Sequence, residues 1–116
     1  MIRVENRLGT VEISNNFFAE LVSHAASGCF GVAGMVASGA SQGFRQMAGA
    51  ELTYKGVLVR AKDGALVVDL HIEVSYGVNI SAVVRSIVSE VRYAVEDTTG
   101  FKVDCVNVFV DAMKSE

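Results

Sequence analysis

The sequence predicts an α+β fold, a two-layer sandwich in which two helices cover one face of a four-stranded sheet. Several short segments alternate apolar and polar residues, which is the pattern of strands with one buried face. Two longer segments repeat apolar residues at helical spacing, so each helix has one apolar stripe. These elements follow the order β-α-β-β-α-β, and elements with one apolar face pack in layers. A ferredoxin-like topology is the first expectation, and a KH-like arrangement is the alternative.

The chain has 116 residues, 51% of them hydrophobic, and is predicted to form a single domain, residues 1–116, with its own core. Its formal net charge of −3 provides no basic field for nucleic acid or anionic lipid.

Cys29 and Cys105 match no metal-ligand spacing and no disulfide framework, which favours a reducing compartment. The N-terminus is polar and charged, unlike a signal peptide. The uncharged stretch 21–44 contains five glycines, so it predicts a buried helix and a loop rather than a membrane span.

The first strand is predicted in "TVEIS", where Val11 and Ile13 share one side. Ser14 suits the N-cap of the helix that follows, because its hydroxyl can accept a free amide of the first turn. Gly28 and Gly31 are expected to end this helix. Its apolar stripe is predicted to contain Phe17, Phe18, Leu21, Val22, Ala25 and Cys29.

Residues 31–56 are predicted to be a Gly-rich connecting segment. The glycines disfavour long regular structure, and long connections of this kind are often functional or mobile. A short helical turn is expected within residues 41–48. Phe44 and Met47 are expected to anchor the segment on the core, with contact to a partner or a membrane surface as the alternative.

The strongest local pattern is a β-hairpin centred on Asp63 and Gly64, the expected sequence of a two-residue type I′ turn. A two-residue turn also fixes the register of the two strands, because a slip of one residue would mix their faces. Arg60 then lies opposite Val67 on the polar side. The pairs expected to share the buried side are Val57 with Leu70, Val59 with Val68, and Ala61 with Leu66.

The second helix is predicted from Ile80 to Thr98, with Asn79 or Ser81 as its N-cap and Gly100 at its end. The last strand, in "KVDCVNVFVDAM", alternates again between two sides. Its two sides are Val106, Val108 and Val110 on one, and Asn107, Phe109 and Asp111 on the other.

Polar residues at every second position, Asp69, His71 and Glu73, mark the outward face of the central strand. The intervening residues are expected to pack under the helices: Val68, Leu70, Ile72, Val74 and Tyr76. We interpret the outward face as a surface that binds a protein partner. The residues expected on it are Glu12, Arg60, Asp69, His71, Glu73, Asn107, Phe109 and Asp111.

The alternative is a metal- or small-molecule-binding enzyme subunit that uses Asp69, His71 and Glu73. Residues two apart on a strand are roughly 6.5–7 Å apart, so His71 and Glu73 can reach one metal. They supply only two ligands, however, and a stable metal site usually needs three or four. A flat sheet face excludes little water, and no nucleophile elbow is present. The acidic side chains would also repel RNA. We therefore predict no catalytic residue, no metal and no cofactor.

Four stretches taken together resemble the alkaline shock protein family: "GTVEIS", "GVAGM", "GVLVRAKDGALVVDLHIEVSYGVNI" and "VRYAVEDTTGFKVDCVNVFV". They cover nearly the whole chain, and it is their order that makes the resemblance specific. The chain departs from the family where Asn15 and Ser81 stand near positions that often hold proline. Cys29 and Phe30 also stand where an acidic residue is common.

The resemblance implies a non-enzymatic, cytoplasmic protein of the envelope or alkaline stress response of Gram-positive bacteria. Members of the family act through protein–protein contacts or self-association, and some sit at the membrane through an integral membrane partner. The resemblance transfers no catalytic residue to this chain. We accordingly expect a protein partner or a homo-oligomer, with no nucleic acid and no direct membrane insertion.

Overall fold

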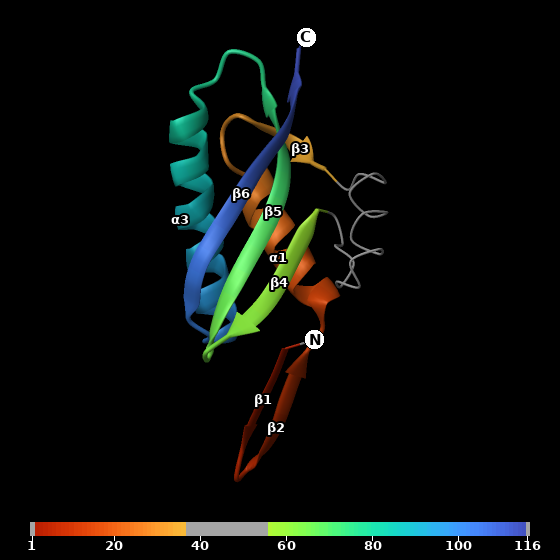
Figure 1. Ribbon diagram of the computed structural model, residues 1–116, viewed down its shortest axis with the longest axis vertical. Coiled ribbons are helices and arrows are strands. Elements are labelled where there is room, and N and C mark those ends of the chain that lie inside the picture. The colour runs from red at the N-terminus through yellow and green to blue at the C-terminus, as the bar shows by residue number, and fades with distance from the viewer. Residues whose placement is uncertain (1, 37–55, 116) are drawn as a thin grey trace.

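The computed structural model describes residues 2–36 and 56–115 (Figure 1). Helices α1 and α3 lie side by side on one face of a four-stranded sheet, and a separate two-stranded hairpin extends from the body. The two-layer α+β fold with both helices on one face is thus confirmed. The elements are β1 (Ile2–Asn6), β2 (Gly9–Ile13), α1 (Asn15–Ser27), β3 (Val32–Met35), β4 (Val57–Lys62), β5 (Ala65–Ser75), α3 (Ile80–Thr99) and β6 (Val103–Lys114).

The central strand of the larger sheet is β5. Strand β6 runs parallel to it along almost its whole length, and α3 makes the crossover that a parallel pair requires. The opposite side of β5 is shared by two antiparallel strands. Strand β4 pairs with its first half, and β3 pairs with its second half. The sheet is therefore mixed, with β5 held on both sides.

The β4–β5 hairpin has the predicted register, with Val57 opposite Leu70 and Arg60 opposite Val67. Asp63 has φ 51° and Gly64 has φ 82°, the two positive values that a type I′ turn requires. Ala61 was expected on the buried side but is exposed, because it lies close to the turn at the end of the hairpin.

Helix α1 begins after Ser14, whose Oγ accepts a hydrogen bond from the amide of Phe17 (3.1 Å). The cap is as predicted, but the buried stripe is turned by about one residue. Phe18 is fully buried, whereas Phe17 is 45% exposed and lies beside the hairpin. The side chains of α1 that are buried are Phe18, Ala19, Val22, Ser23 and Ala26.

Helix α3 is capped by Asn79, whose Oδ1 accepts from the amide of Ala82 (3.1 Å), and it ends at Gly100 with φ 78°. Both ends agree with the prediction. Tyr76 was expected under the helices but is 72% exposed, because β5 ends at Ser75 and Tyr76 begins the turn beyond it. The core between α1, α3 and the sheet is formed mainly by Phe18, Val22, Val59, Val68, Leu70, Ile72, Val74, Ile87, Val91 and Val95.

The N-terminal strand has a different place from the one expected. Strand β2 pairs with β1, which was not predicted, and this pair forms a sheet of its own. The fourth strand of the main sheet is instead β3, inside the predicted Gly-rich segment 31–56. Strand β3 has only four residues, one of them Gly34, and its pairing is interrupted by a β-bulge between Val32 and Gly34. The sequence therefore predicted a loop here and not a strand. The predicted turn at 41–48 and the contacts of Phe44 and Met47 lie outside the described residues.

Candidate functional site: the outer face of the sheet

From Val68 to Ser75, alternation along β5 divides its residues between the core and the opposite surface. Ile72 is fully buried beneath the helices, and its neighbours His71 and Glu73 face the other way. We call this surface, which no described helix covers, the outer sheet face. It consists of Arg60 from β4, Asp69, His71 and Glu73 from β5, and Asn107, Phe109 and Asp111 from β6.

Asp69 ties the three strands together on this face. Its Oδ2 accepts a hydrogen bond from Arg60 Nη2 (2.9 Å), and its Oδ1 accepts one from Asn107 Nδ2 (2.8 Å). The Asp69 side chain is 17% exposed and that of Arg60 is 54% exposed. Both carboxylate oxygens are thus engaged across neighbouring strands, which leaves Asp69 poorly placed to bind an external group.

His71 is held by two neighbours on β6. Its Nδ1 lies 2.7 Å from Asp111 Oδ2, and its ring stacks on Phe109 with centroids 4.7 Å apart and an interplanar angle of 16°. The β5–β6 register shifts between Ile72 and Glu73, so Asp111 is an extra residue in β6. This bulge brings the Asp111 carboxylate to the imidazole.

Glu73 and Phe109 have contact groups that the cross-strand hydrogen bonds of this face leave unused. The Glu73 carboxylate forms no hydrogen bond or ion pair with any residue the structure describes. Its neighbour on β3 is Gly34, which has no side chain to cover it. Phe109 is 44% exposed although one side of its ring stacks on His71. A carboxylate with no partner among the described residues and an aromatic ring are therefore available for contacts on a sheet whose strands are joined by side-chain hydrogen bonds.

Glu12 does not belong to this surface. It was expected beside the others on the assumption that its strand joins the main sheet. The structure places it on β2 of the separate hairpin, where its Oε2 lies 3.3 Å from Arg3 Nε. The other seven predicted residues do lie together on the outer sheet face.

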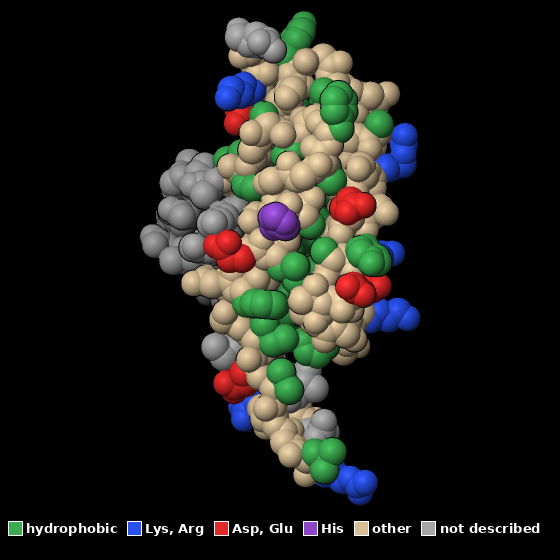
Figure 2. Space-filling model, turned by 180° about the vertical axis from the view of Figure 1, so that it is seen from behind, with side chains coloured by type: hydrophobic (Ala, Val, Ile, Leu, Met, Phe, Trp, Pro, Cys, Tyr) green, Lys and Arg blue, Asp and Glu red, His purple; other side chains and the backbone are tan. Residues whose placement is uncertain are grey.

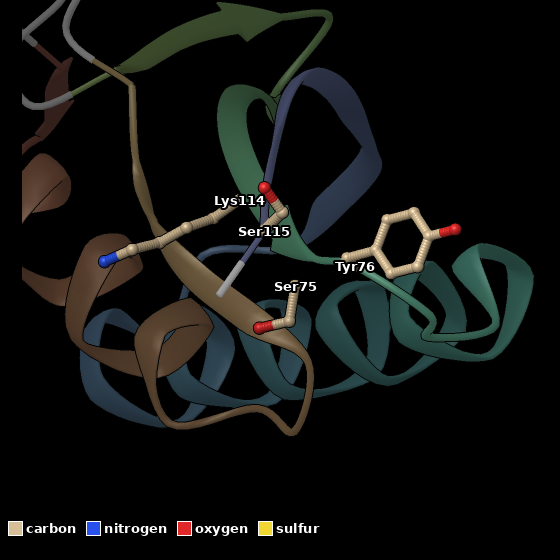
Figure 3. A pocket seen from close by; sticks show the side chains of 4 residues that line it. All are labelled: Ser75, Tyr76, Lys114 and Ser115. Carbon is tan, nitrogen blue, oxygen red and sulfur yellow. The ribbon is translucent and has the colours of Figure 1, made fainter.

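The described residues of the outer sheet face show no cluster of metal ligands. Across residues 2–36 and 56–115, no three or more His, Cys, Asp or Glu side chains gather as a metal site would require. A cavity of about 450 Å³ lies at the far end of β5 and β6, lined by Ser75, Tyr76, Lys114 and Ser115. Figure 3 shows that the Tyr76 and Lys114 side chains point to opposite sides of it.

The model of the alkaline shock protein 23 family, described as having a cell envelope-related function, matches residues 3–115. The chain belongs to this family. The match confirms the resemblance noted in the sequence, and it gives the chain a family-level function related to the cell envelope.

Two relatives match this alkaline shock family protein over almost its full length, and both are described as uncharacterized. YloU of Bacillus subtilis (strain 168) is 32% identical over 114 residues, which is 97% of this chain and 95% of YloU. Spy1614 of Streptococcus pyogenes serotype M6 is 33% identical over 114 residues, which is 97% of this chain and 94% of Spy1614.

Solved structures of MamM CTD variants have a similar fold. The H285A variant has a TM-score of 0.52 at 15% identity and covers 87% of this chain and 100% of its own. The H264E variant has a TM-score of 0.51 at 15% identity and covers 85% and 95%. At this identity the likeness concerns the fold alone. Within the described ranges, no helix combines the length and apolar character needed to cross a membrane.

Proposed function

We propose that this protein is a non-enzymatic member of the envelope and alkaline stress response, and that it acts through protein–protein contacts made by the outer sheet face. The observation that carries the proposal is the bonding of that face. Its central polar groups are paired with one another across three strands, while Phe109 is 44% exposed and the half-buried Glu73 carboxylate has no partner among the described residues. A surface that is already rigid loses little entropy on binding, and an exposed aromatic ring is a common anchor of interfaces.

The same pairing supports a role without catalysis. A general base or a metal ligand needs a lone pair directed at the reacting group. Both oxygens of Asp69 and the Nδ1 of His71 are directed at Arg60, Asn107 and Asp111 instead. The enzyme-subunit alternative would be left with the Glu73 carboxylate and the Nε2 of His71, two ligands where a stable metal site usually needs three or four.

The proposed place of action is the cytoplasmic side of the envelope, at the membrane through an integral membrane partner. The envelope-related function of the family supports this location. The net charge of −3 favours attachment through a protein over attachment to anionic lipid, because lipid-binding surfaces are basic. It likewise disfavours nucleic acid as a partner.

Matched substitutions on the two faces of the molecule test the proposal. Glu73→Lys and Phe109→Ser change the outer sheet face without removing any of the side-chain hydrogen bonds that join its strands. Glu90→Lys and Tyr93→Ser make the same changes at exposed positions of α3, on the helix side seen in Figure 2. Each variant replaces the native protein in its host, which is grown under alkaline stress and then cross-linked for affinity capture.

The two outer-face variants are expected to lose the captured partner and to grow as poorly under stress as a deletion strain. The two α3 variants are expected to behave like the native protein. Equal capture and growth for all four would refute the assignment of this face. Metal analysis of the purified protein tests the absence of a metal role, because stoichiometric metal that disappears in His71→Ala would reverse the ranking of the two functions.

A further inference from the structure

The β1–β2 hairpin, residues 2–13, is an arm with little support from the rest of the chain. Its strands pair only with each other in the described part of the structure. Figure 1 shows the arm extending away from the sandwich. Its base is anchored, because Ile2 is only 6% exposed and joins the core. A two-stranded hairpin alone is at best marginally stable in water, so an extended arm of this kind gains from a partner surface.

The arm has one charged face and one apolar face. Arg3 Nε lies 3.0 Å from Glu5 Oε2 and 3.3 Å from Glu12 Oε2, so these three side chains form the charged face. On the other face, Ile13 pairs with Ile2 at the base and Val11 lies two residues further out. Val11 is 54% exposed, so the apolar face of the arm is uncovered beyond its base.

The free edge of β6 is uncovered as well. Strand β6 is 12 residues long and pairs with β5 alone among the described strands. On its helix side, Val110 aligns with Ile72 and Met113 aligns with Val74. The two β5 residues are fully buried, whereas Val110 is 36% and Met113 is 52% exposed. A long edge strand with exposed apolar side chains is a template for adding another strand.

We propose that the arm of one copy of this chain adds to the free edge of β6 in a second copy and continues its sheet. The faces match in this arrangement. The apolar side of the arm, with Val11, lies on the same side as Val110 and Met113 of the second copy. The charged side, with Arg3 and Glu12, continues the outer sheet face. An added strand of this kind contributes main-chain hydrogen bonds, and the matching faces determine its orientation.

The contact is between copies because the arm of each copy points away from its own β6 terminus. Figure 1 places the arm at one end of the molecule and the C-terminal end of β6 at the other. Arm and edge are different surfaces, so the association is head-to-tail and each copy offers one of each. This inference goes beyond the proposed function, since neither surface is part of the exposed groups assigned to partner docking.

Sedimentation velocity of the purified full chain over a wide range of concentrations tests the proposal. The native protein is expected to associate increasingly with concentration. Val11→Lys alters only the arm and Met113→Glu alters only the edge, and both positions are exposed, so the fold is preserved. Each variant alone is expected to raise the apparent dissociation constant at least about tenfold, because the new charge becomes buried in the contact. Thr10→Lys, on the charged side of the arm, and Tyr93→Glu, on α3, are controls expected to associate normally.

Mixing the two defective variants gives the sharpest result. Val11→Lys still has a native edge and Met113→Glu still has a native arm, so an equimolar mixture is expected to form a dimer and nothing larger. A native protein that stays monomeric, variants that associate normally, or a mixture that stays monomeric would each overturn the proposal. Glu73→Lys is expected to self-associate like the native chain, so a failure of outer-face docking leaves this test unaffected.

Discussion

The loop between α1 and β3 allows a quantitative test, because it contains a glycine pressed against α3. Gly31 has φ 91°, and a Cβ placed there would lie 2.7 Å from Val83 Cγ2 and 3.3 Å from Val78 Cγ1. Its carbonyl accepts a hydrogen bond from the amide of Ser75 (2.9 Å), which joins the loop to the end of β5. Gly77 has the same φ of 91° with nothing within 4 Å of the added Cβ. The two positions differ in packing and not in backbone strain.

Alanine at either position costs about 1–2 kcal/mol for a positive φ. At Gly31 the methyl group also overlaps Val83, which is 4% exposed and β-branched, so its side chain has little freedom to rotate away. Overpacking of this kind costs about 1–3 kcal/mol. We therefore expect Gly31→Ala to lower the free energy of unfolding by about 2–5 kcal/mol, and Gly77→Ala by about 1–2 kcal/mol.

Urea unfolding followed by circular dichroism measures both values, and comparison of the two variants removes the effect of alanine on the unfolded chain. The expected difference is about 1–3 kcal/mol, a large part of the 5–15 kcal/mol typical of a small domain. Equal losses for the two variants would show that the loop does not press on α3, and the placement of β3 beside β5 would then be wrong.

The same urea assay tests two helix features and the bonding of the outer sheet face. Asn79→Ala removes the N-cap of α3 and is expected to cost about 0.5–2 kcal/mol; no loss would mean that the cap is not formed. Phe18→Ala is expected to cost about 3–5 kcal/mol and Phe17→Ala clearly less, since only Phe18 is fully buried; the reverse order would contradict the orientation of α1. Asp69→Ala is expected to cost about 1–3 kcal/mol, because Arg60 and Asn107 lose a shared acceptor, and an unchanged midpoint would argue against a braced face.

The parts of the fold that were predictable are those determined by local sequence. The Asp63-Gly64 turn fixes the β4–β5 register, because both residues adopt the positive φ that the turn requires. The caps at Ser14 and Asn79 were predictable for the same reason, since each depends on one side chain and the amide three residues away.

The parts that were missed depend on contacts distant in sequence. Strand β3 contains Gly34 and a bulge, so only its pairing with β5 makes it a strand. The hairpin turn between β1 and β2 consists of Arg7 and Leu8, which are not typical turn residues. The first predicted strand was therefore assigned to the main sheet, and Glu12 was placed on the wrong surface.

The outer sheet face was predictable as a set of residues but not as a set of bonds. Alternation alone places Asp69, His71 and Glu73 on one side of β5. Their partners depend on how β6 aligns with β5 and on the bulge that moves Asp111 to His71, and neither has a signal in the sequence. The place of Met113 was not predictable either, because alternation puts it on the side of Phe109, and it is the bulge at Asp111 that moves it to the helix side, where it is 52% exposed.

Site-specific photo-cross-linking in the native host under alkaline stress tests whether the outer sheet face docks a partner. A photoreactive phenylalanine analogue replaces Phe109 on the outer sheet face, or Tyr93 on α3 as the control, since both side chains are aromatic and exposed. Cross-linking to a discrete envelope protein from position 109, with none from position 93, is the predicted result. The same protein captured from position 93 alone, or no adduct from position 109, would contradict docking through the outer sheet face.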